Sequence, residues 1–213
     1  MRLNIIGLQT FLEREIGRFM HVWIQALMSP WINAFLYITV FGSLVGSRIQ
    51  HFGEFRYIEF VFPGILMLNI INAAFAHTSF SLYFQRFAKH IEEILTAPLS
   101  YAEMIIGYVL SAIVRAAIIA AGIYAIAIFF GAARIVSPFL FVYYTVLVAT
   151  IFSLVGLIVA LWSNTFEQLS ILNTFFITPM TFLGGVFSST DMLPAGLRWL
   201  HTWNPFFYFV DGL

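Results

Sequence analysis

Residues 138–162 read PFLFVYYTVLVATIFSLVGLIVALW, a run without a single charged side chain. A helix rises about 1.5 Å per residue, so a run of this length crosses the hydrocarbon core of a bilayer, which is about 30 Å thick. Pro138 stands at the start of the run, where the first turn of a helix would leave its missing N–H unused. The stretch therefore predicts a transmembrane helix that begins at Pro138.

Similar apolar runs recur along the chain, separated by short polar segments. Of the 213 residues, 61% are hydrophobic and only 9% are charged, whereas a soluble domain carries charge at roughly 25% of positions. We therefore expect an all-α integral membrane protein, folded as one domain over residues 1–213. Five complete transmembrane helices are expected, at residues 22–45, 60–84, 104–130, 138–162 and 169–187.

The N-terminal residues 1–21 combine apolar positions at helical spacing with several charges. This pattern is typical of an amphipathic helix, and we expect it to lie in the membrane surface with its charges among the headgroups. A cytoplasmic extension of the first transmembrane helix is the alternative.

The C-terminal part changes character after the fifth run. Residues 188–205 are rich in Trp, Pro and Gly, which suits short re-entrant helices at the outer face. The last apolar run, 206–213, is too short to cross a bilayer. We expect it to be the start of a sixth transmembrane helix that this chain lacks.

The charged residues exclude several classes of function. Ten basic and ten acidic residues cancel, so no long-range field favours nucleic acid. Lys89 is the one lysine and is not part of a Gly-Lys-Ser/Thr phosphate loop, the chain has no cysteine, and its histidines show no i, i+4 metal pair. We expect no catalytic residue, no metal site and no cofactor bound by this chain.

The distribution of basic residues gives a weak orientation signal. Arg14, Arg18, Arg86 and Lys89, with Arg2, fall on the side of the N-terminus, and four arginines fall on the opposite side. The positive-inside rule therefore favours a cytoplasmic N-terminus.

Polar side chains inside the apolar runs mark a candidate translocation path. Arg115 lies near the middle of the third run, where a guanidinium needs a polar partner. The fifth run carries a polar stripe at helical spacing, and the second run carries two amides. Helix packing is the alternative reading of these side chains, because small polar residues also let helices approach closely. The candidate path residues are Asn69, Asn72, Arg115, Asn173, Thr174, Thr178 and Thr181.

Residues 85–100, between the second and third runs, mix charges with apolar residues at helical spacing. The pattern predicts a short amphipathic helix that ends before Pro98. Such a helix could enter a groove on a soluble partner. A solvated connector is the alternative.

Several motifs in this order resemble one family. Residues 91–98, IEEILTAP, look like the coupling helix of ABC-2 type permeases, the membrane subunits of ATP-binding cassette exporters. Phe62-Pro63-Gly64, residues 184–187 (GGVF) with 192–194 (MLP), and residues 203–208 (WNPFFY) resemble further motifs of that family. The opening, residues 15–20 (EIGRFM), resembles the connecting helix of bacterial inner-membrane permeases in the drug and polysaccharide export branch.

The resemblance implies a permease subunit that hydrolyses no ATP itself. Two six-span subunits, expected to be a homodimer in the bacterial inner membrane, would bind two cytoplasmic ATPase subunits that carry ATP and Mg. The exported substrate would be amphipathic, lipid-like, drug-like or a saccharide. An ATPase-independent channel or secondary transporter is the alternative. Contact with the ATPase is expected from Arg86, Lys89, His90, Ile91, Glu92, Glu93, Leu95, Thr96 and Pro98.

Overall fold

The computed structural model describes residues 4–45, 56–132, 137–186 and 203–211, and every described regular element is a helix. The elements are α1 (Ile5–His21), η1 (Ile24–Met28), α2 (Ser29–Thr39), η2 (Val40–Val45), α3 (Tyr57–Phe87), α4 (Ile91–Thr96), α5 (Tyr101–Phe129), α6 (Pro138–Trp162), α7 (Phe166–Leu172), η3 (Asn173–Ile177), α8 (Thr178–Thr181), η4 (Phe182–Val186) and α10 (Pro205–Asp211), where η marks a π-helix. The all-α prediction is confirmed for the described residues.

Four described helices are long and apolar enough to cross a membrane: Ile24–Gly42, Tyr57–Phe87, Tyr101–Phe129 and Pro138–Trp162. They correspond to the first four expected transmembrane helices. The expected fifth, at 169–187, is not among them, so five complete spans are not supported. The chain is helical there from α7 to η4, with the polar residues Asn173, Thr174 and Thr178 along it, and residue 187 lies outside the described residues.

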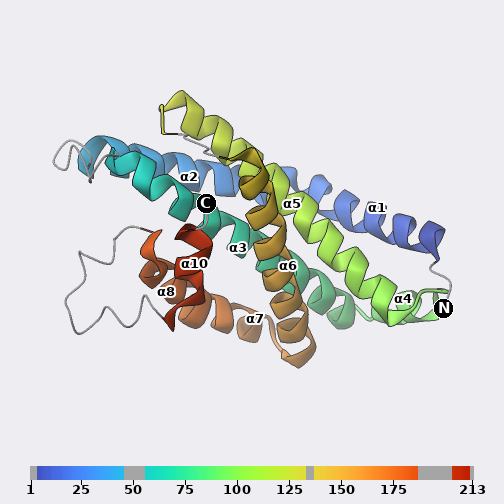
Figure 1. Ribbon diagram of the computed structural model, residues 1–213. Coiled ribbons are helices and arrows are strands. Elements are labelled where there is room, and N and C mark those ends of the chain that lie inside the picture. Colours follow the sequence, from blue (N-terminus) through green and yellow to red (C-terminus); the bar gives the residue numbers. More distant parts are fainter. Residues whose placement is uncertain (1–3, 46–55, 133–136, 187–202, 212–213) are drawn as a thin grey trace.

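Helix α3 lies at the centre of the bundle, with α5, α6 and α2 around it (Figure 1). Of its most apolar window, 72% is buried inside the protein, against 22%, 33% and 50% for the other three candidate spans. This burial explains why α3 has apolar residues on every side and no amphipathic pattern.

The closest packing of α3 is against α6, at Gly156. The Thr78 hydroxyl donates to the carbonyl of Ser153 at 2.9 Å, from one helix to the other. A Cβ on Gly156 would meet the Thr78 side chain and would lie 2.7 Å from the carbonyl oxygen of Phe75. Only a residue without a side chain permits this approach, as is common between helices in membranes.

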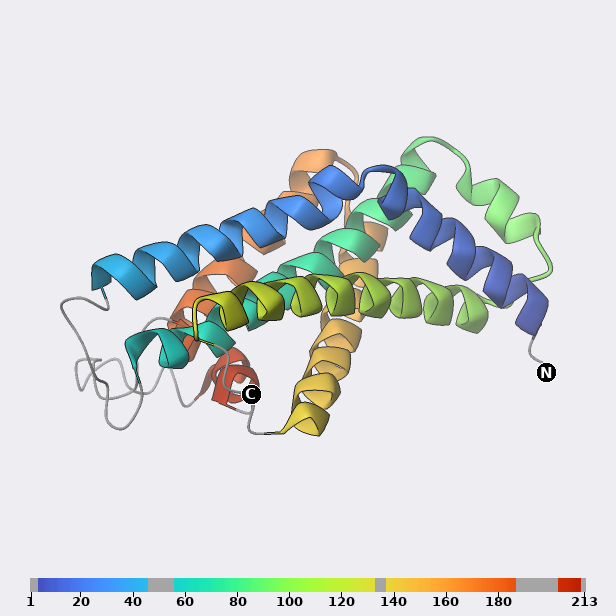
Figure 2. The same cartoon turned by 90° about the horizontal axis from the view of Figure 1, so that it is seen from above.

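Helix α1 is tied to the bundle along one face. Its buried residues are Phe11, Glu15 and Phe19, spaced four residues apart. The Phe11 ring meets that of Tyr108 on α5 edge to face, with centroids 5.0 Å apart. The chain then bends between α1 and α2, so that the two helices run in different directions (Figure 2). The helix expected at residues 1–21 is confirmed over α1, but the expectation that its charges all face the headgroups is wrong, since Glu15 is 0% exposed.

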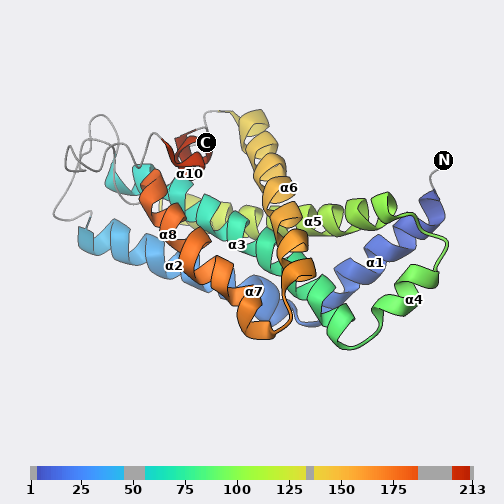
Figure 3. The same cartoon turned by 90° about the horizontal axis from the view of Figure 1, so that it is seen from below.

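Residues 85–100, which were expected to form one amphipathic helix, are divided among the end of α3, a turn and a separate short helix. Helix α3 continues to Phe87, the chain turns at residues 88–90, and α4 is only six residues long. Lys89 has φ of 60°, the left-handed region, which ends the helix because L-residues cannot continue a right-handed helix through it. The short α4 lies beside the N-terminal half of α1 (Figure 3).

The C-terminal helix α10 packs near η4 and α3. The side-chain amide of Asn204 donates to the carbonyl of Met180 at 2.7 Å, and its oxygen accepts the N–H of Phe206 at 3.0 Å. This one residue joins α10 to the helix that precedes it in the bundle. The expected re-entrant segment 188–205 lies outside the described residues except for 203–205.

Replacing Gly156 with alanine tests the α3–α6 contact. We expect the free energy of unfolding in detergent to fall by about 1–3 kcal/mol, because the new methyl group forces the helices apart. The matched control is Gly17→Ala on α1, where no atom lies within 4 Å of the new Cβ. Equal stability of the two variants in thermal unfolding would contradict the close-packing role of Gly156.

Candidate functional site

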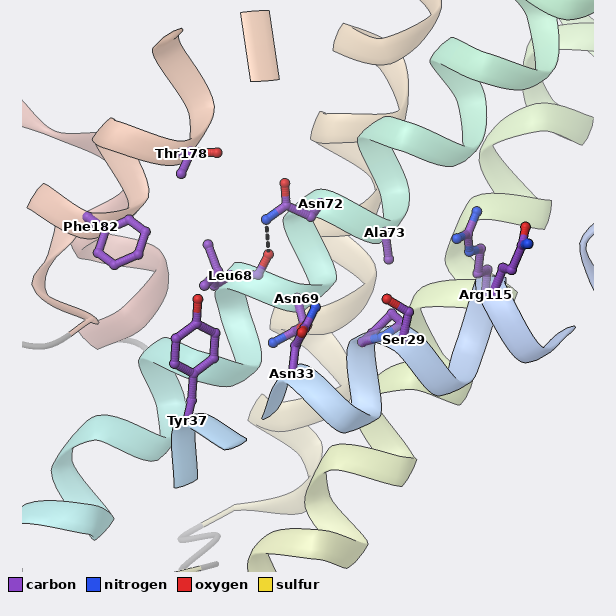
Figure 4. A pocket seen from close by; sticks show the side chains of 12 residues that line it. Ser29, Asn33, Tyr37, Leu68, Asn69, Asn72, Ala73, Arg115, Thr178 and Phe182 are labelled. Atoms are coloured by element: carbon purple, nitrogen blue, oxygen red, sulfur yellow. Dashed lines mark hydrogen bonds between the residues drawn. The ribbon is translucent and has the colours of Figure 1, made fainter. Parts of the chain in front are cut away.

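A polar cavity of about 320 Å³ lies at mid-depth of the bundle, between α2, α3, α5 and the α8–η4 helix (Figure 4). Asn72 is the middle residue of α3 (Tyr57–Phe87) and Arg115 is the middle residue of α5 (Tyr101–Phe129). The cavity is lined by Gln25, Ser29, Pro30, Asn33, Tyr37, Leu68, Asn69, Asn72, Ala73, Arg115, Thr178 and Phe182. We call it the amide cavity.

The two asparagines of α3 are partly satisfied by their own helix. Asn69 donates to the carbonyl of Ile65 at 2.8 Å. Asn72 donates to that of Leu68 at the same distance (Figure 4). These bonds hold both side chains against the helix on the cavity side. They lower the cost of placing amides in an apolar bundle, because a buried amide without a partner is unfavourable.

Arg115 is the charged group of the amide cavity. Its guanidinium donates to the carbonyl of Ala26 at 3.2 Å, and its Nε is buried without a hydrogen-bond partner in the described structure. Ala26 belongs to η1, where the π-helical turn departs from the regular i→i−4 hydrogen bonding and allows this carbonyl to accept from a side chain. An arginine at the middle of a transmembrane helix costs about 2.5–3.5 kcal/mol on insertion scales. One carbonyl contact leaves most of its donors available.

A second cavity, of about 470 Å³, adjoins the amide cavity, and Gln25 and Arg115 line both. We call it the aromatic cavity because its other lining is mostly apolar and includes the rings of Phe19, Phe80 and Phe84. Its remaining lining residues are Arg18, Phe19, Val22, Ala26, Ala76, His77, Phe80, Ser81 and Phe84. Arg115 therefore stands between a polar space and a largely apolar one.

The described geometry brings together part of the expected path. Asn69, Asn72, Arg115 and Thr178 line the amide cavity. Three other expected residues do not: Thr174 is exposed, Thr181 is buried and donates to the carbonyl of Ile177 at 2.6 Å, and Asn173 is half-buried with its oxygen unpaired. Their role in transport stays a prediction.

Sequence reasoning missed the contribution of the first span. Gln25, Ser29, Asn33 and Tyr37 follow one another at intervals of four, so they occupy one face of the first transmembrane helix. This spacing was a usable signal. The first run contains these polar residues without a charge, so it reads as uniformly apolar unless the interval is counted.

The end of the bundle near α4 is fixed by a carboxylate. Glu103 accepts from the backbone N–H of Asn4, and also from the backbone and hydroxyl of Ser100 at 2.7 and 2.8 Å. The Asn4 amide donates to the carbonyl of Pro98 at 3.1 Å. The start of α1, the end of α4 and the start of α5 are therefore joined by hydrogen bonds over a few residues.

A second carboxylate joins α1 to α3. Glu15 accepts from Arg18 and Ser81, each at 2.6 Å, and from Gln85 at 3.1 Å. Arg14 donates to the side-chain oxygen of Gln85 at 2.9 Å. We call this group the Glu15 network. Every described partner of the buried carboxylate is a donor, so the charge is compensated where it is buried.

The expected ATPase-contact residues divide into two groups. Arg86 is half-buried, and its guanidinium donates to the last carbonyls of α6, including those of Leu161 at 2.9 Å and Ser163 at 3.3 Å. It therefore caps the C-terminus of α6, where a cation is favourable. Ile91 is also half-buried. Exposed side chains are those of Lys89, His90, Glu92, Glu93, Leu95, Thr96 and Pro98.

Two hollows lie between α1 and α4 beside these exposed residues. One, of about 400 Å³, is lined by Arg14, Arg18, Phe84, Gln85, His90 and Glu93. The other, of about 270 Å³, is lined by Gly7, Thr10, Phe11, Arg14, Glu93, Ile94, Ala97, Pro98 and Leu99. Ile94 is buried in this contact, so the apolar stripe expected to be free on the segment is partly used within the chain.

One buried histidine, His77, lies inside the described helices. No group of three or more His, Asp or Glu side chains among the described residues could hold a metal ion. His77 is buried and bonded to the Ser111 hydroxyl at 2.8 Å, and Ser111 donates onward to the carbonyl of Tyr108. This pair serves to join α3 to α5.

Comparison with known proteins decides the family. The ABC-2 type transporter family matches residues 7–213. The chain belongs to the ABC-2 type transporter family. Over 212 residues it is 38% identical to the inner membrane transport permease YadH of Escherichia coli K12, covering 100% of this chain and 83% of that protein.

A more distant relative is nodulation protein J of Rhizobium leguminosarum bv. trifolii, 21% identical over 189 residues, which cover 88% of this chain and 72% of that protein. No solved structure matches the chain. The family resemblance read from the motifs is confirmed. The chain is thus a membrane component of a transporter, in agreement with the expectation that it is not an enzyme, and permeases of this family generally pair with an ATPase subunit.

The Glu15 network leads to a stability prediction. Replacing Glu15 with glutamine removes a charge that accepts three donors and sets an amide N–H₂ against Arg18. We expect the free energy of unfolding to fall by about 1.5–3 kcal/mol, the usual contribution of a hydrogen bond to a charged group. Thermal unfolding in detergent and amide hydrogen exchange of α1 measure the effect.

Glu13→Gln is the matched control, because Glu13 is exposed on the same helix and bonds only Gln9. If Glu15→Gln left both stability and α1 exchange as in Glu13→Gln, the carboxylate would have no anchoring role.

Proposed function

We propose that this chain is the membrane subunit of an ATP-driven exporter whose ATPase is a separate protein. Two copies of the permease would pair as a homodimer and bind two ATPase subunits. ATP and Mg would be held by those partners alone. On this proposal the chain contributes the pathway and converts closure of the ATPase pair into movement of its helices.

The observation that carries the proposal is an exposed, charged short helix that is firmly attached to the bundle. In α4, Glu92, Glu93 and Leu95 are exposed, while Ile94 is buried and lines the hollow that α4 shares with α1. Glu103 and Asn4 fix the end of this helix through the hydrogen bonds to Ser100 and Pro98. A surface that must transmit force needs both exposure to the partner and a rigid attachment, and α4 has the two together.

The same attachments connect α4 to the long helices of the bundle, so a movement of α4 could reach them. The turn at Lys89 connects α4 to α3, Ser100 connects it to α5, and Arg86 ties the same end of α3 to the end of α6. A displacement of α4 would therefore move the ends of three long helices at once. Rigid-body motion of helices about such contacts is a common form of transporter switching.

Orientation and span number follow from the same proposal. A cytoplasmic ATPase requires α4 on the cytoplasmic side, and α1 lies beside α4, which gives a cytoplasmic N-terminus. The protein would be a multi-pass protein of the bacterial inner membrane. The helix from α7 to η4 would be its fifth span, and α10 would begin the sixth.

The substrate class is proposed from the pathway lining. The amide cavity offers hydrogen bonds, and the aromatic cavity offers apolar surface. An amphipathic, lipid-like, drug-like or saccharide substrate suits this pair better than a bare ion, which needs rings of charge or dedicated carbonyl cages.

Co-purification tests the proposal. The full-length protein, extracted from its native membrane in mild detergent, should carry a stoichiometric ATPase identified by mass spectrometry. Changing Glu92 to Lys together with Leu95 to Ala should reduce the bound ATPase at least tenfold while the permease still inserts.

The control is Arg56→Gln combined with Phe129→Ala. These two residues, one charged and one apolar, lie at the ends of α3 and α5 that are far from α4, and this variant should retain the ATPase. Reproducible purification without any ATPase would favour a channel or secondary transporter. Undiminished ATPase in the α4 variant would show that the partner docks elsewhere.

A further inference from the structure

The charges around the two neighbouring cavities do not balance. Arg18 lines the aromatic cavity, but Glu15 accepts from it at 2.6 Å and offsets its charge. Arg115 lines both cavities, and neither lining contains an Asp or Glu. In the described part of the chain, Arg115 is therefore a cation whose only hydrogen bond goes to a neutral carbonyl.

Donors for a ligand gather on the side of the amide cavity. The Nε of Arg115 is buried without a hydrogen-bond partner in the described structure, and the exposed side chains of Gln25, Ser29 and Asn33 line the same cavity. A guanidinium binds an oxyanion with two parallel N–H bonds, which is its strongest mode of recognition. The site is thus equipped for an oxyanion flanked by hydrogen-bonding groups.

The other side of Arg115 is apolar. Phe19 and Val22 line the aromatic cavity together with Ala76, Phe80 and Phe84 of α3. Phe80 and Phe84 are also partly exposed at the surface of the bundle, with their rings stacked at 5.9 Å. An apolar chain could extend from Arg115 along these rings.

The two helices that border the amide cavity opposite α3 contain π-helical turns. One is η1, which carries Gln25 and the carbonyl that Arg115 uses, and the other is η3, directly before Thr178. Such turns are frequent at functional sites, because they interrupt regular helical bonding and permit local adjustment. In this chain they flank the cavity that Asn33, Asn69, Asn72 and Arg115 line together.

We propose that Arg115 binds the oxyanion of an amphipathic molecule, with its polar headgroup in the amide cavity and its apolar chain in the aromatic cavity. This inference rests on the proposed function, because only a transporter would make the bound molecule a substrate. It adds the charge and the amphipathic character of that substrate. The binding site itself needs no ATPase.

Binding of dodecyl phosphate to the purified full-length protein tests the site. Binding is measured by thermophoresis in excess dodecyl maltoside, a neutral molecule with the same alkyl chain. Any binding of dodecyl phosphate above this background is then due to its anionic group. We expect saturable binding of dodecyl phosphate and at least tenfold weaker binding of inorganic phosphate, which has the anion without the chain. Equal affinity for the two would overturn the amphipathic part of the proposal.

The variants locate the anion. Arg115→Gln should weaken dodecyl phosphate binding at least tenfold, and Arg115→Lys less, since it keeps the charge and loses the planar pair of donors. Arg56→Gln makes the same chemical change at the end of α3, away from both cavities, and should bind as the unmodified protein does. Unchanged affinity in folded Arg115→Gln would overturn the proposal.

Asn33→Asp keeps the proposal falsifiable if Arg115→Gln does not fold. It leaves Arg115 in place and adds a carboxylate to the wall of the amide cavity, so dodecyl phosphate binding should again fall at least tenfold. Unchanged binding in this variant would contradict the site. Anion binding without a co-purifying ATPase would support the site and contradict the proposed exporter. A co-purifying ATPase without anion binding would support the exporter and contradict the site.

Discussion

The contact between α3 and α6 at Gly156 is the constraint on which the bundle depends. In lipid, apolar side chains gain little by leaving one apolar surface for another, so helices associate through close packing and hydrogen bonds. The missing side chain at Gly156 and the Thr78 bond to the Ser153 carbonyl supply both. Once α3 is held against α6, its remaining faces are available to α5 and α2. The amide cavity lies on the α2 side of this core.

The α4 end of α3 and its middle are held in different ways. At the α4 end, carboxylates and guanidinium groups join neighbouring helices through Glu15, Glu103 and Arg86. At mid-depth, the neighbouring helices contain π-helical turns and an arginine whose one hydrogen bond within the described residues goes to a carbonyl. A stiff end and an adjustable middle suit a protein that receives force at one end and changes its pathway in the middle. The same difference makes the middle of the bundle the natural place for a ligand.

Much of the fold follows from the sequence. Length and charge locate four long helices within a few residues, since a bilayer requires apolar runs of a set length. A short helix was expected between the second and third helices and is present as α4, but the division of residues 85–100 was not foreseen. Lys89 adopts a left-handed conformation that glycine or asparagine would have signalled and lysine does not. A complete fifth span was expected from its apolar residues alone, but the helix from α7 to η4 is not among the four described helices that are long and apolar enough to cross a membrane.

The site was predictable only in part. Arg115 and the α3 asparagines are conspicuous because polar groups in apolar runs need partners. Their meeting with the face from Gln25 to Tyr37 depends on how α2 packs, which one sequence does not reveal. Glu15 was placed among the headgroups because an amphipathic helix usually exposes its charges. Its donors Ser81 and Gln85 are over sixty residues away in sequence, so no local pattern announces the buried carboxylate.

That separation also has a consequence for how the protein is made. While α1 leaves the ribosome, Ser81 and Gln85 have not yet been synthesised, and the one described partner Glu15 can already have is Arg18, one helical turn away. This ion pair within α1 compensates the charge of the Glu15 carboxylate before the rest of the bundle has been synthesised. Only after the second span has inserted does α1 acquire the donors that seat it. The order of synthesis therefore makes the docking of the first helix a late step in biogenesis.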